Sequence, residues 1–510
     1  MDGPGNATLR LDPRDEVAIA LRELAAGDPL TPHAGRALEV VPVGHKVALV
    51  PLAAGRTIHR SGQPIGIDSE TIAAGAHVHL DNMNFEASMA ARAIGTRLSN
   101  APRLAAADVP TFDGYRRADG KAGTRNYIGV LTSVNCSSLV ARAIADHFRD
   151  PARLAAFPGV DGVVALTHKS GCSIAEGGRS MGMLRRTLGG YARHPNFAGV
   201  LIVGLGCEDN QIERLIEEER LAAGPRLRTL VMQDLGGTRA SVAAGIAAVE
   251  AMLAEASRAR REPIPAAEIV VGLQCGGSDS FSGISANPAL GAAVDRLVAA
   301  GGTAILSETP EIYGAENLLL ERAVSDEVGR KLIGLLDWWG DYTRHEPQGL
   351  DNNPSPGNKA GGLTTILEKS LGAVAKGGST NLVDVIAYAT PVEKRGLIFM
   401  DSPGFDPMSA TGQVASGANL ICFTTGRGSC FGCRPTPSLK LATNSDIYRR
   451  MEDDMDIDCG AILDGVATVE EIGETIFRRM LAVASGAPTK SELLGYGDDE
   501  FAPWHVNAWL

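Results

Sequence analysis

The chain of 510 residues has few aromatic residues, few cysteines and no excess of positive charge. Phe, Trp and Tyr make up 5% of it, and the net charge is −12. An acidic chain lacks the basic surface that nucleic-acid binding requires, so a nucleic-acid partner is not expected. The 8 cysteines lack the dense spacing of a disulfide scaffold. Because the net charge is negative, any anionic substrate would need a local basic pocket.

Long hydrophobic runs are missing as well. No apolar run reaches the length that crosses a bilayer. The opening residues, MDGPGNATLRLDPRDEV, have neither the basic nor the apolar region of a signal peptide. We therefore expect a cytoplasmic protein with reduced thiols and no membrane partner. Glycine is abundant instead, at 60 residues, which is typical of an α/β enzyme with many tight turns.

Four apolar runs each end in a cysteine. They are IGVLTSVNC (128–136), GVVALTHKSGC (162–172), GVLIVGLGC (199–207) and IVVGLQC (269–275). Each run is typical of a strand buried on both faces, and helix-like stretches follow most of them, which predicts a parallel sheet. Ligands bind at the carboxyl ends of such strands. We therefore expect these four cysteines to face one crevice, although free cysteine is often only a small buried hydrophobe.

The pattern along the chain predicts an α/β fold in three parts. A small N-terminal β-rich module (12–84) precedes a linker (85–111), a central α/β domain (112–258) and a C-terminal α/β domain (259–510), both with largely parallel sheets. Periodicity predicts helices over 15–27 and 469–486, each ending at glycine.

Two histidines stand two residues apart in the β-rich module, in His77-Val78-His79. On a strand, residues i and i+2 share one face, so both imidazoles would point the same way. Two imidazoles on one face are good ligands for a divalent metal, and Asp81 continues the series as a candidate oxygen ligand. The alternative is two exposed histidines on an edge strand.

Several polar loops are candidates for binding an acidic substrate. The loop DGYRRADGKAGTRNY (113–127) carries Arg125 and Asn126 beside a buried strand, and FTTGRGS (423–429) places Arg427 in a glycine loop after another strand. Arginine binds carboxylates bidentately. The sequence GGSDS after Cys275 offers backbone N–H groups and one carboxylate. Its candidate binding residues are Gly276, Gly277, Ser278 and Asp279.

Candidate catalytic groups lie in the same half of the chain. Glu308 follows the apolar run TAIL, so a buried carboxylate with a raised pKa is expected there as an acid or base. Lys359 lies in the turn-rich stretch NPSPGNKAGG, where it would neutralise a substrate carboxylate or act as a base. Solvated or structural charge is the alternative for each of these residues, and for Arg427.

Taken together, these motifs resemble a known family. The similar segments are GYRRADGKAGTRNYIGVLTSVNC, VDGVVALTHKSGC, HPNFAGVLIVGLGCEDNQ, VGLQCGGSDSFSGISANPALG, GGTAILSETPEIYGAE, NPSPGNKAGGLTTILEKSLG, FTTGRGS and MDIDCGAI. Over almost its whole length, the chain resembles the altronate dehydratase/galactarate dehydratase family, and its GHKVAL…GQPIG…HVH module resembles that family's SAF-type (β-clip) domain. The resemblance implies an iron-dependent hydro-lyase that acts on a small sugar acid, and we also expect a homo-oligomer.

The resemblance implies iron without placing it. Fe²⁺ is expected, with Mn²⁺ as a possible substitute. Either Cys172, Cys207 and Cys275 hold an iron–sulfur cluster with Cys136 to spare, or His77 and His79 hold one ion with help from His168 or a cysteine. His168 is in addition a candidate acid or base. Cys430 and Cys433 depart from the family pattern; they are either metal ligands or unpaired thiols.

The choice of substrate also stays open. The histidine pair favours the D-altronate type, which yields a 2-keto-3-deoxy acid. Galactarate or another aldarate or aldonate is the alternative, followed by a carbon–sulfur lyase of the sulfolactate type. From a different class, a non-catalytic metal- or sugar-acid-binding protein is considered. A nicotinamide oxidoreductase is disfavoured, because GLGCED lacks a full phosphate-binding fingerprint.

Overall fold

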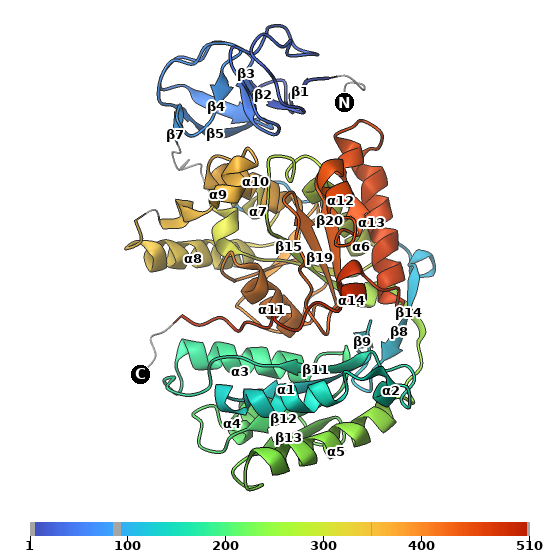
Figure 1. Ribbon diagram of the computed structural model, residues 1–510. Helices are drawn as coiled ribbons and strands as arrows, with labels where there is room; N and C mark the ends of the chain where they lie inside the picture. Colours follow the sequence, from blue (N-terminus) through green and yellow to red (C-terminus); the bar gives the residue numbers. More distant parts are fainter. Residues whose placement is uncertain (1–5, 85–92, 348, 507–510) are drawn as a thin grey trace.

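A computed structural model describes residues 6–84, 93–347 and 349–506. In Figure 1 the N-terminal module lies at the top, the C-terminal domain in the middle and the second domain at the bottom. The N-terminal module consists of two small antiparallel sheets, of order β1-β2-β3-β6 and β4-β5-β7. The strands are β1 (Thr8–Leu9), β2 (Val17–Ala20), β3 (Lys46–Ala48), β4 (Thr57–Arg60), β5 (Gln63–Asp68), β6 (His77–Val78) and β7 (Met83–Asn84).

One predicted element of this module is wrong. The helix expected over 15–27 is instead strand β2, which pairs with β1 on one side and β3 on the other. All four residues of β2 are buried. A short apolar run fits a buried strand as well as a helix, and pairing with two neighbours decides in favour of the strand.

The second domain contains a four-stranded parallel sheet of order β11-β10-β12-β13. Helices α1 and α5 cover one face of it, and α3 covers the other. Its elements are β10 (Tyr127–Thr132), α1 (Ser138–His147), α2 (Pro151–Leu154), β11 (Gly162–Leu166), α3 (Arg179–Ala192), β12 (Phe197–Gly204), α4 (Ile212–Glu218), β13 (Leu227–Val231) and α5 (Thr238–Ala256).

A small sheet of order β14-β8-β9 links the two α/β domains. It consists of β8 (Thr111–Arg116), β9 (Ala122–Gly123) and β14 (Glu262–Pro265). The expected linker begins with residues 85–92, which lie outside the described residues. Its described part is irregular, apart from a short 3-10 turn at Ala106–Asp108.

The C-terminal domain contains a seven-stranded parallel sheet of order β17-β18-β16-β15-β19-β20-β21. Its strands are β15 (Val270–Cys275), β16 (Thr303–Leu306), β17 (Leu382–Ile386), β18 (Leu397–Met400), β19 (Leu420–Thr425), β20 (Ser438–Ala442) and β21 (Ile457–Asp458). Its helices are α6 (Ala286–Ala299), α7 (Asn317–Leu320), α8 (Asp326–Thr343), α9 (Pro356–Ala360), α10 (Ile366–Ala375), α11 (Asp406–Ser416), α12 (Ser445–Arg450), α13 (Val469–Ala484) and α14 (Lys490–Leu494). The predicted tail helix is confirmed as α13.

The strand order reverses beside β15, because the chain continues to β16 on one side and reaches β19 on the other. In open parallel sheets, the crevice outside the strand ends at such a point is the usual ligand site. The N-terminal module lies over this edge of the sheet (Figure 1). The expected α/β fold class, with an N-terminal β-module and parallel sheets behind it, is confirmed.

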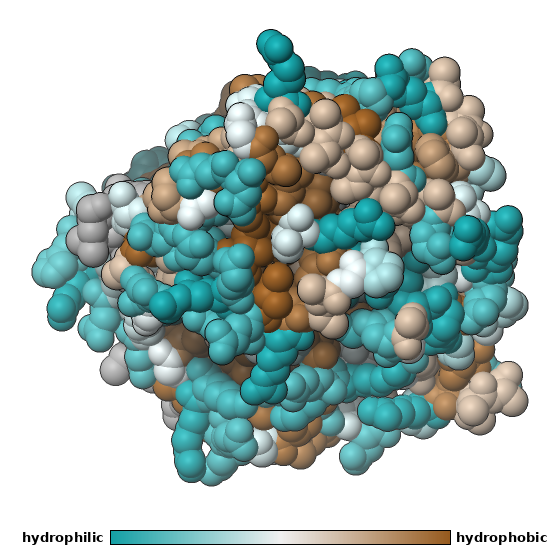
Figure 2. Space-filling view, turned by 90° about the horizontal axis from the view of Figure 1, so that it is seen from below, coloured by the Kyte–Doolittle hydropathy of each residue, from teal (hydrophilic) through white to brown (hydrophobic). Residues whose placement is uncertain are grey.

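The two α/β domains share one hydrophobic core where α3 packs against α11. A Cβ atom added at Gly190 of α3 would lie 2.2 Å from the backbone oxygen of Ala415, so only glycine allows this approach. Among the described helices, none is long and apolar enough to cross a bilayer. The face seen from below, at the second-domain end, is mostly hydrophilic, with a band of hydrophobic residues through it (Figure 2).

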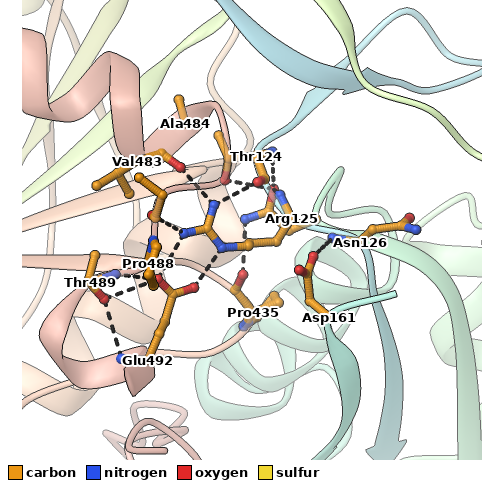
Figure 3. Close-up of polar contacts among 12 residues, drawn as sticks. Thr124, Arg125, Asn126, Asp161, Pro435, Val483, Ala484, Pro488, Thr489 and Glu492 are labelled. Atoms are coloured by element: carbon orange, nitrogen blue, oxygen red, sulfur yellow. Dashed lines mark hydrogen bonds and ion pairs between the residues drawn. The ribbon is translucent and has the colours of Figure 1, made fainter. Parts of the chain in front are cut away.

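A buried ion pair also joins the second domain to the end of the chain (Figure 3). Arg125, just before β10, is bidentate to Glu492 of α14 at 2.6 and 2.8 Å. It also donates to the backbone oxygens of Thr124, Val483 and Ala487. Its side chain is only 4% exposed. Arg125 therefore fixes the domain junction, and its guanidinium is not available to a substrate.

Replacing Arg125 tests this junction. Arg125→Met leaves the mostly buried Glu492 carboxylate without its cationic partner, with only its hydrogen bonds from Thr489 remaining, which is expected to lower the free energy of unfolding by about 3 kcal/mol. Urea denaturation followed by tryptophan fluorescence measures the change. The matched control is Arg330→Met, which breaks an exposed pair with Asp326 in α8 and should cost below about 1 kcal/mol. Equal losses in the two variants would contradict the role of the Arg125 pair.

Candidate functional site

Three histidines converge on one face of the N-terminal module. Their candidate ligand nitrogens all lie within 4.8 Å of one another, and the members are His45, His77 and His79. His77 and His79 come from β6 and the residue after it, as the i+2 spacing predicts. His45 precedes β3, which pairs with β6, and its Nδ1 lies 2.9 Å from His77 Nε2. Asp81 is exposed and is not part of this group.

Burial keeps the histidine triad neutral. It lowers the pKa of His45 and His77, and it lowers that of His79 to about 4. His79 Nδ1 is buried and has no hydrogen-bond partner among the described residues. Neutral imidazoles with lone pairs directed at one point are what a divalent transition metal requires. The triad therefore fits a divalent iron or manganese ion.

A buried charge cluster holds the triad against the C-terminal domain. Lys46, next to His45, lies 3.0 Å from a carboxylate oxygen of Glu368 on α10 and also donates to the Gly362 oxygen. Arg60 reaches Glu368 at 2.5 Å and the Ser280 oxygen at 2.6 Å. His45 Nε2 then lies 3.4 Å from the Ala360 oxygen, at the end of α9. The triad thus borders the switch-point edge of the large sheet.

Two glycine loops form the crevice at the switch point. After β15 and β19, the backbone N–H groups of Gly426 and Arg427 both donate to the Gly277 oxygen. Arg427 is exposed and lines a cavity of about 380 Å³, together with Arg449 and Arg450 of α12. Val43, Ala360 and Gly361 line the same cavity, so it opens beside the histidine triad. Asp279, Asp446 and Asp464 line it as well, and Arg449 pairs with Asp446, so the cavity carries charges of both signs.

The other residues predicted in the first of these loops have structural partners. Asp279 is buried, and its carboxylate accepts hydrogen bonds from Ser282, Thr443 and Asn444. The Ser278 backbone oxygen accepts from Asn358 of α9, whereas the Ser278 hydroxyl is buried without a hydrogen-bond partner among the described residues. Gly276 leaves room for Asp406, since an added Cβ would lie 2.3 Å from a carboxylate oxygen of that residue. Asp279 therefore shapes the loop and has no free oxygen directed at a ligand.

A second cluster lies at the carboxyl ends of β15 and β16. Cys275, Glu308 and Glu311 bring their ligand atoms within 4.8 Å of one another, and all three are buried. Lys376 Nζ lies 2.9 Å from the Cys275 sulfur and 3.6 Å from Glu308. Lys369 Nζ lies 2.7 Å from Glu311. Because two ammonium groups already supply the positive charge here, this acid–lysine centre is suited to proton transfer rather than to a metal ion.

Glu308 is the most unusual residue of the centre. Its backbone has φ 73°, in the left-handed region, although it is not glycine. Neither carboxylate oxygen has a hydrogen-bond partner among the described residues. Burial, with the charge of Glu311, raises its pKa well above the usual value. A strained, buried and protonated carboxyl group is typical of a catalytic acid.

Asp406, at the start of α11, lies at the open side of the centre. It lines a cavity of about 340 Å³ together with Cys275, Glu311, Asn358 and Lys369. Burial and the nearby Glu311 charge raise the pKa of Asp406 to about 7. A carboxylate that changes charge near neutral pH is suited to act as a general base.

Three residues that the sequence predicts for the site lie outside both the histidine triad and the acid–lysine centre. Lys359 lies half-buried on α9 and lines neither of the two cavities, while Lys369 and Lys376 form the ion pairs of the centre. His168 lies in the second domain, where Nε2 is 2.8 Å from the Thr132 oxygen and Nδ1 accepts from Ser170. Burial lowers its pKa to about 4, so it is a neutral structural group. Asn126 likewise bonds Asp161, Gly159 and Ala256 inside the second domain.

The expectation of a single crevice with four cysteines is wrong. Cys136, Cys172 and Cys207 follow strands of the second-domain sheet and are exposed, whereas Cys275 ends β15 of the other sheet and is buried. A cluster on Cys172, Cys207 and Cys275 would need both sheets to share one edge. Burial raises the pKa of Cys275 to about 12, so its thiol stays protonated. Cys430 is exposed while Cys433 is buried, and among the described residues neither belongs to a compact group of metal ligands.

Comparison with known proteins agrees with this architecture. Residues 6–86 match the altronate/galactarate dehydratase SAF domain, residues 114–257 the D-galactarate dehydratase/altronate hydrolase second domain, and residues 266–508 the D-galactarate/altronate dehydratase C-terminal domain. The chain therefore belongs to the altronate/galactarate dehydratase family. It is an enzyme of the hydro-lyase class.

Curated relatives match over nearly the full length. The chain is 38% identical to the galactarate dehydratase (L-threo-forming) of Escherichia coli, over 94% of this chain and 92% of that protein. It is 35% identical to the altronate dehydratase of Bacillus subtilis, over 94% and 95%. It is 34% identical to the altronate dehydratase of Escherichia coli, over 95% and 96%. These identities are too similar to select one substrate.

The histidine triad predicts a specific metal dependence. His79→Ala removes one ligand and is expected to weaken Mn²⁺ or Fe²⁺ binding by at least about 100-fold, beyond what changes around a metal site usually cost. Anaerobic calorimetry with the full chain measures the affinity. The control is His59→Ala, which alters a histidine of the same module that pairs with Glu16 outside the triad. Equal metal affinity in the His79 variant and the unmodified chain would contradict the assignment.

Proposed function

We propose that this enzyme removes water from a sugar acid of the D-altronate type to give a 2-keto-3-deoxy acid, using a divalent iron ion held by the histidine triad. Family membership supports dehydration of a sugar acid. The observation that carries the proposal is the neutral triad beside a cavity lined by Arg427, Arg449 and Arg450. Mn²⁺ is the second candidate, because imidazole ligands favour iron, whereas manganese prefers oxygen ligands.

The chemistry explains why such groups are required. Removing the proton next to a carboxylate places a second negative charge on that group, and the departing β-hydroxyl needs a proton or a Lewis acid. A divalent ion on the triad would supply positive charge to the substrate carboxylate and hydroxyl groups. The arginines of the cavity bind and orient the acid, because guanidinium groups pair bidentately with carboxylates.

We assign proton transfer to the acid–lysine centre. Asp406 is the general base, because its pKa of about 7 leaves it ionised in part at neutral pH. Protonated Glu308 is the donor for the leaving hydroxyl, and Lys369 stabilises the charge that develops between them. Helix α9 borders both cavities, since Ala360 lines the arginine cavity and Asn358 the Asp406 cavity, and we propose that the substrate lies along this helix. Neutralisation of the substrate carboxylate by Lys359 stays a prediction.

Substrate assays separate the alternatives. Protein purified without oxygen and supplied with Fe²⁺ is expected to dehydrate D-altronate, detected as a 2-keto-3-deoxy acid by mass spectrometry. Galactarate is the first alternative, because its second carboxylate would pair with Arg450, while Arg449 of the same cavity already pairs with Asp446. Sulfolactate tests a carbon–sulfur lyase. Binding of these acids without turnover of any of them would contradict the enzyme assignment and favour a non-catalytic binding protein. The reduced thiols and ferrous iron also favour the cytoplasm, and we expect a homo-oligomer.

The acid–lysine centre predicts a pH profile. The rate constant kcat/KM is expected to rise as pH increases through about 7, because Asp406 must lose its proton to act as a base. Asp406→Asn should remove this ascending limb and lower kcat by roughly 10²- to 10⁴-fold. Asp341→Asn, at an exposed position on α8, is the control and should leave the profile unchanged. An Asp406→Asn enzyme that kept both the limb and the rate would exclude Asp406 as the base.

A further inference from the structure

Three cysteines at one sheet edge remain outside the site described so far. Cys136, Cys172 and Cys207 follow the neighbouring parallel strands β10, β11 and β12, and all three are exposed free thiols. Free cysteine is among the residues most often buried. The other sheet follows that rule, since Cys275, Cys422 and Cys459 are buried there. Three exposed thiols at the carboxyl ends of adjacent strands, where ligands bind, call for a functional explanation.

Backbone contacts bind the three cysteine loops to one another. The Asn135 N–H donates to the Ser170 oxygen at 2.9 Å, which joins the Cys136 and Cys172 loops. The Asn210 N–H donates to the Gly171 oxygen at 3.0 Å, which joins the Cys172 and Cys207 loops. The Asn210 side chain also donates to the Ser133 oxygen at 2.9 Å, which closes the set. One network of hydrogen bonds therefore holds the three cysteine loops together.

The hydrogen-bond network beneath the three cysteine loops is buried and tightly packed. Ser133, Glu208 and Asn210 are each buried, and the Ser133 hydroxyl donates to Glu208 at 2.6 Å. Gly171 has φ 103°, and a Cβ there would lie 2.4 Å from the Ser133 oxygen. Only glycine permits that close approach, which positions Cys172 beside the Cys136 loop. Ordering a buried polar network of this kind costs conformational entropy, and a surface without a function does not need such order.

The three thiols do not form the compact group that a single metal ion requires. Tetrahedral binding to one metal, with metal–sulfur bonds of about 2.3 Å, would hold the sulfurs about 4 Å apart. Among the described residues, the groups whose ligand atoms all lie within 4.8 Å of one another do not include these three cysteines. In an iron–sulfur cluster each cysteine binds a different iron, so the sulfurs lie farther apart. Gln233 also donates to the Cys207 sulfur at 3.4 Å, the type of hydrogen bond that tunes such clusters.

We infer that Cys136, Cys172 and Cys207 hold a cubane-type iron–sulfur cluster in the second domain, separate from the ion of the histidine triad. Each sulfur binds one iron as a thiolate, and assembly from two ferrous ions, two ferric ions and four sulfides releases the three thiol protons and needs no further oxidant. The fourth iron then carries no cysteine from this sheet edge and faces solvent. This placement differs from a cluster that includes Cys275, which the two-sheet arrangement excludes.

Reconstitution without oxygen tests the cluster. The full chain is incubated with equal amounts of ferrous and ferric iron, with sulfide and with dithiothreitol, desalted, and assayed for iron, acid-labile sulfide, visible absorption and Mössbauer parameters. About four sulfides per chain are expected, with about four irons in the cluster, one more on the triad, and a broad charge-transfer band. The variant C136S/C172S/C207S should lose the sulfide and the band. A variant that retains both, or an unmodified chain that takes up no sulfide, would overturn the inference.

Alkylation gives a second readout within one molecule. Before reconstitution, iodoacetamide should label Cys136, Cys172, Cys207 and the equally exposed Cys430, as mapped by peptide mass spectrometry. After reconstitution, only Cys430 should remain reactive. Continued labelling of all four would contradict the cluster. The triad variant His79→Ala separates this site from the proposed function, because it should lose sulfide-free iron and keep the protected cysteines.

Discussion

The buried charge cluster of Lys46, Arg60 and Glu368 is the contact on which the site depends. Burial alone would raise the pKa of Glu368, yet the two cations lower it to about 2. The ionised carboxylate therefore stabilises the folded state at every pH above the usual pKa of glutamate. This contribution is lost as the pH falls toward 2. Because Lys46 adjoins His45, the same contact that docks the N-terminal module also positions the histidine triad. Fold and metal site are thus linked through one carboxylate.

Two chemically different centres result from this arrangement. The triad lies on the N-terminal module and offers neutral imidazoles, whereas the acid–lysine centre lies at the strand ends of the C-terminal domain. Helix α9 contributes residues to the cavity beside each centre, Ala360 to one and Asn358 to the other.

Local patterns in the sequence predicted much of this structure. The apolar runs before the cysteines became strands, and the His77-Val78-His79 spacing placed two imidazoles together. His45 was missed, because its contribution depends on the pairing of β3 with β6, which local patterns do not specify. Lys369 and Lys376 were missed because they resemble the polar face of an ordinary helix. The cysteines were wrongly grouped, since buried parallel strands look alike whichever sheet they join.

The most direct test of the account is the position of the metal. Crystals grown without oxygen and soaked in Fe²⁺ would be measured on both sides of the iron absorption edge. The account predicts an anomalous peak between His45, His77 and His79 that disappears in His79→Ala crystals. A peak beside Cys275, Glu308 and Glu311, with none at the triad, would contradict it and make the acid–lysine centre the metal site.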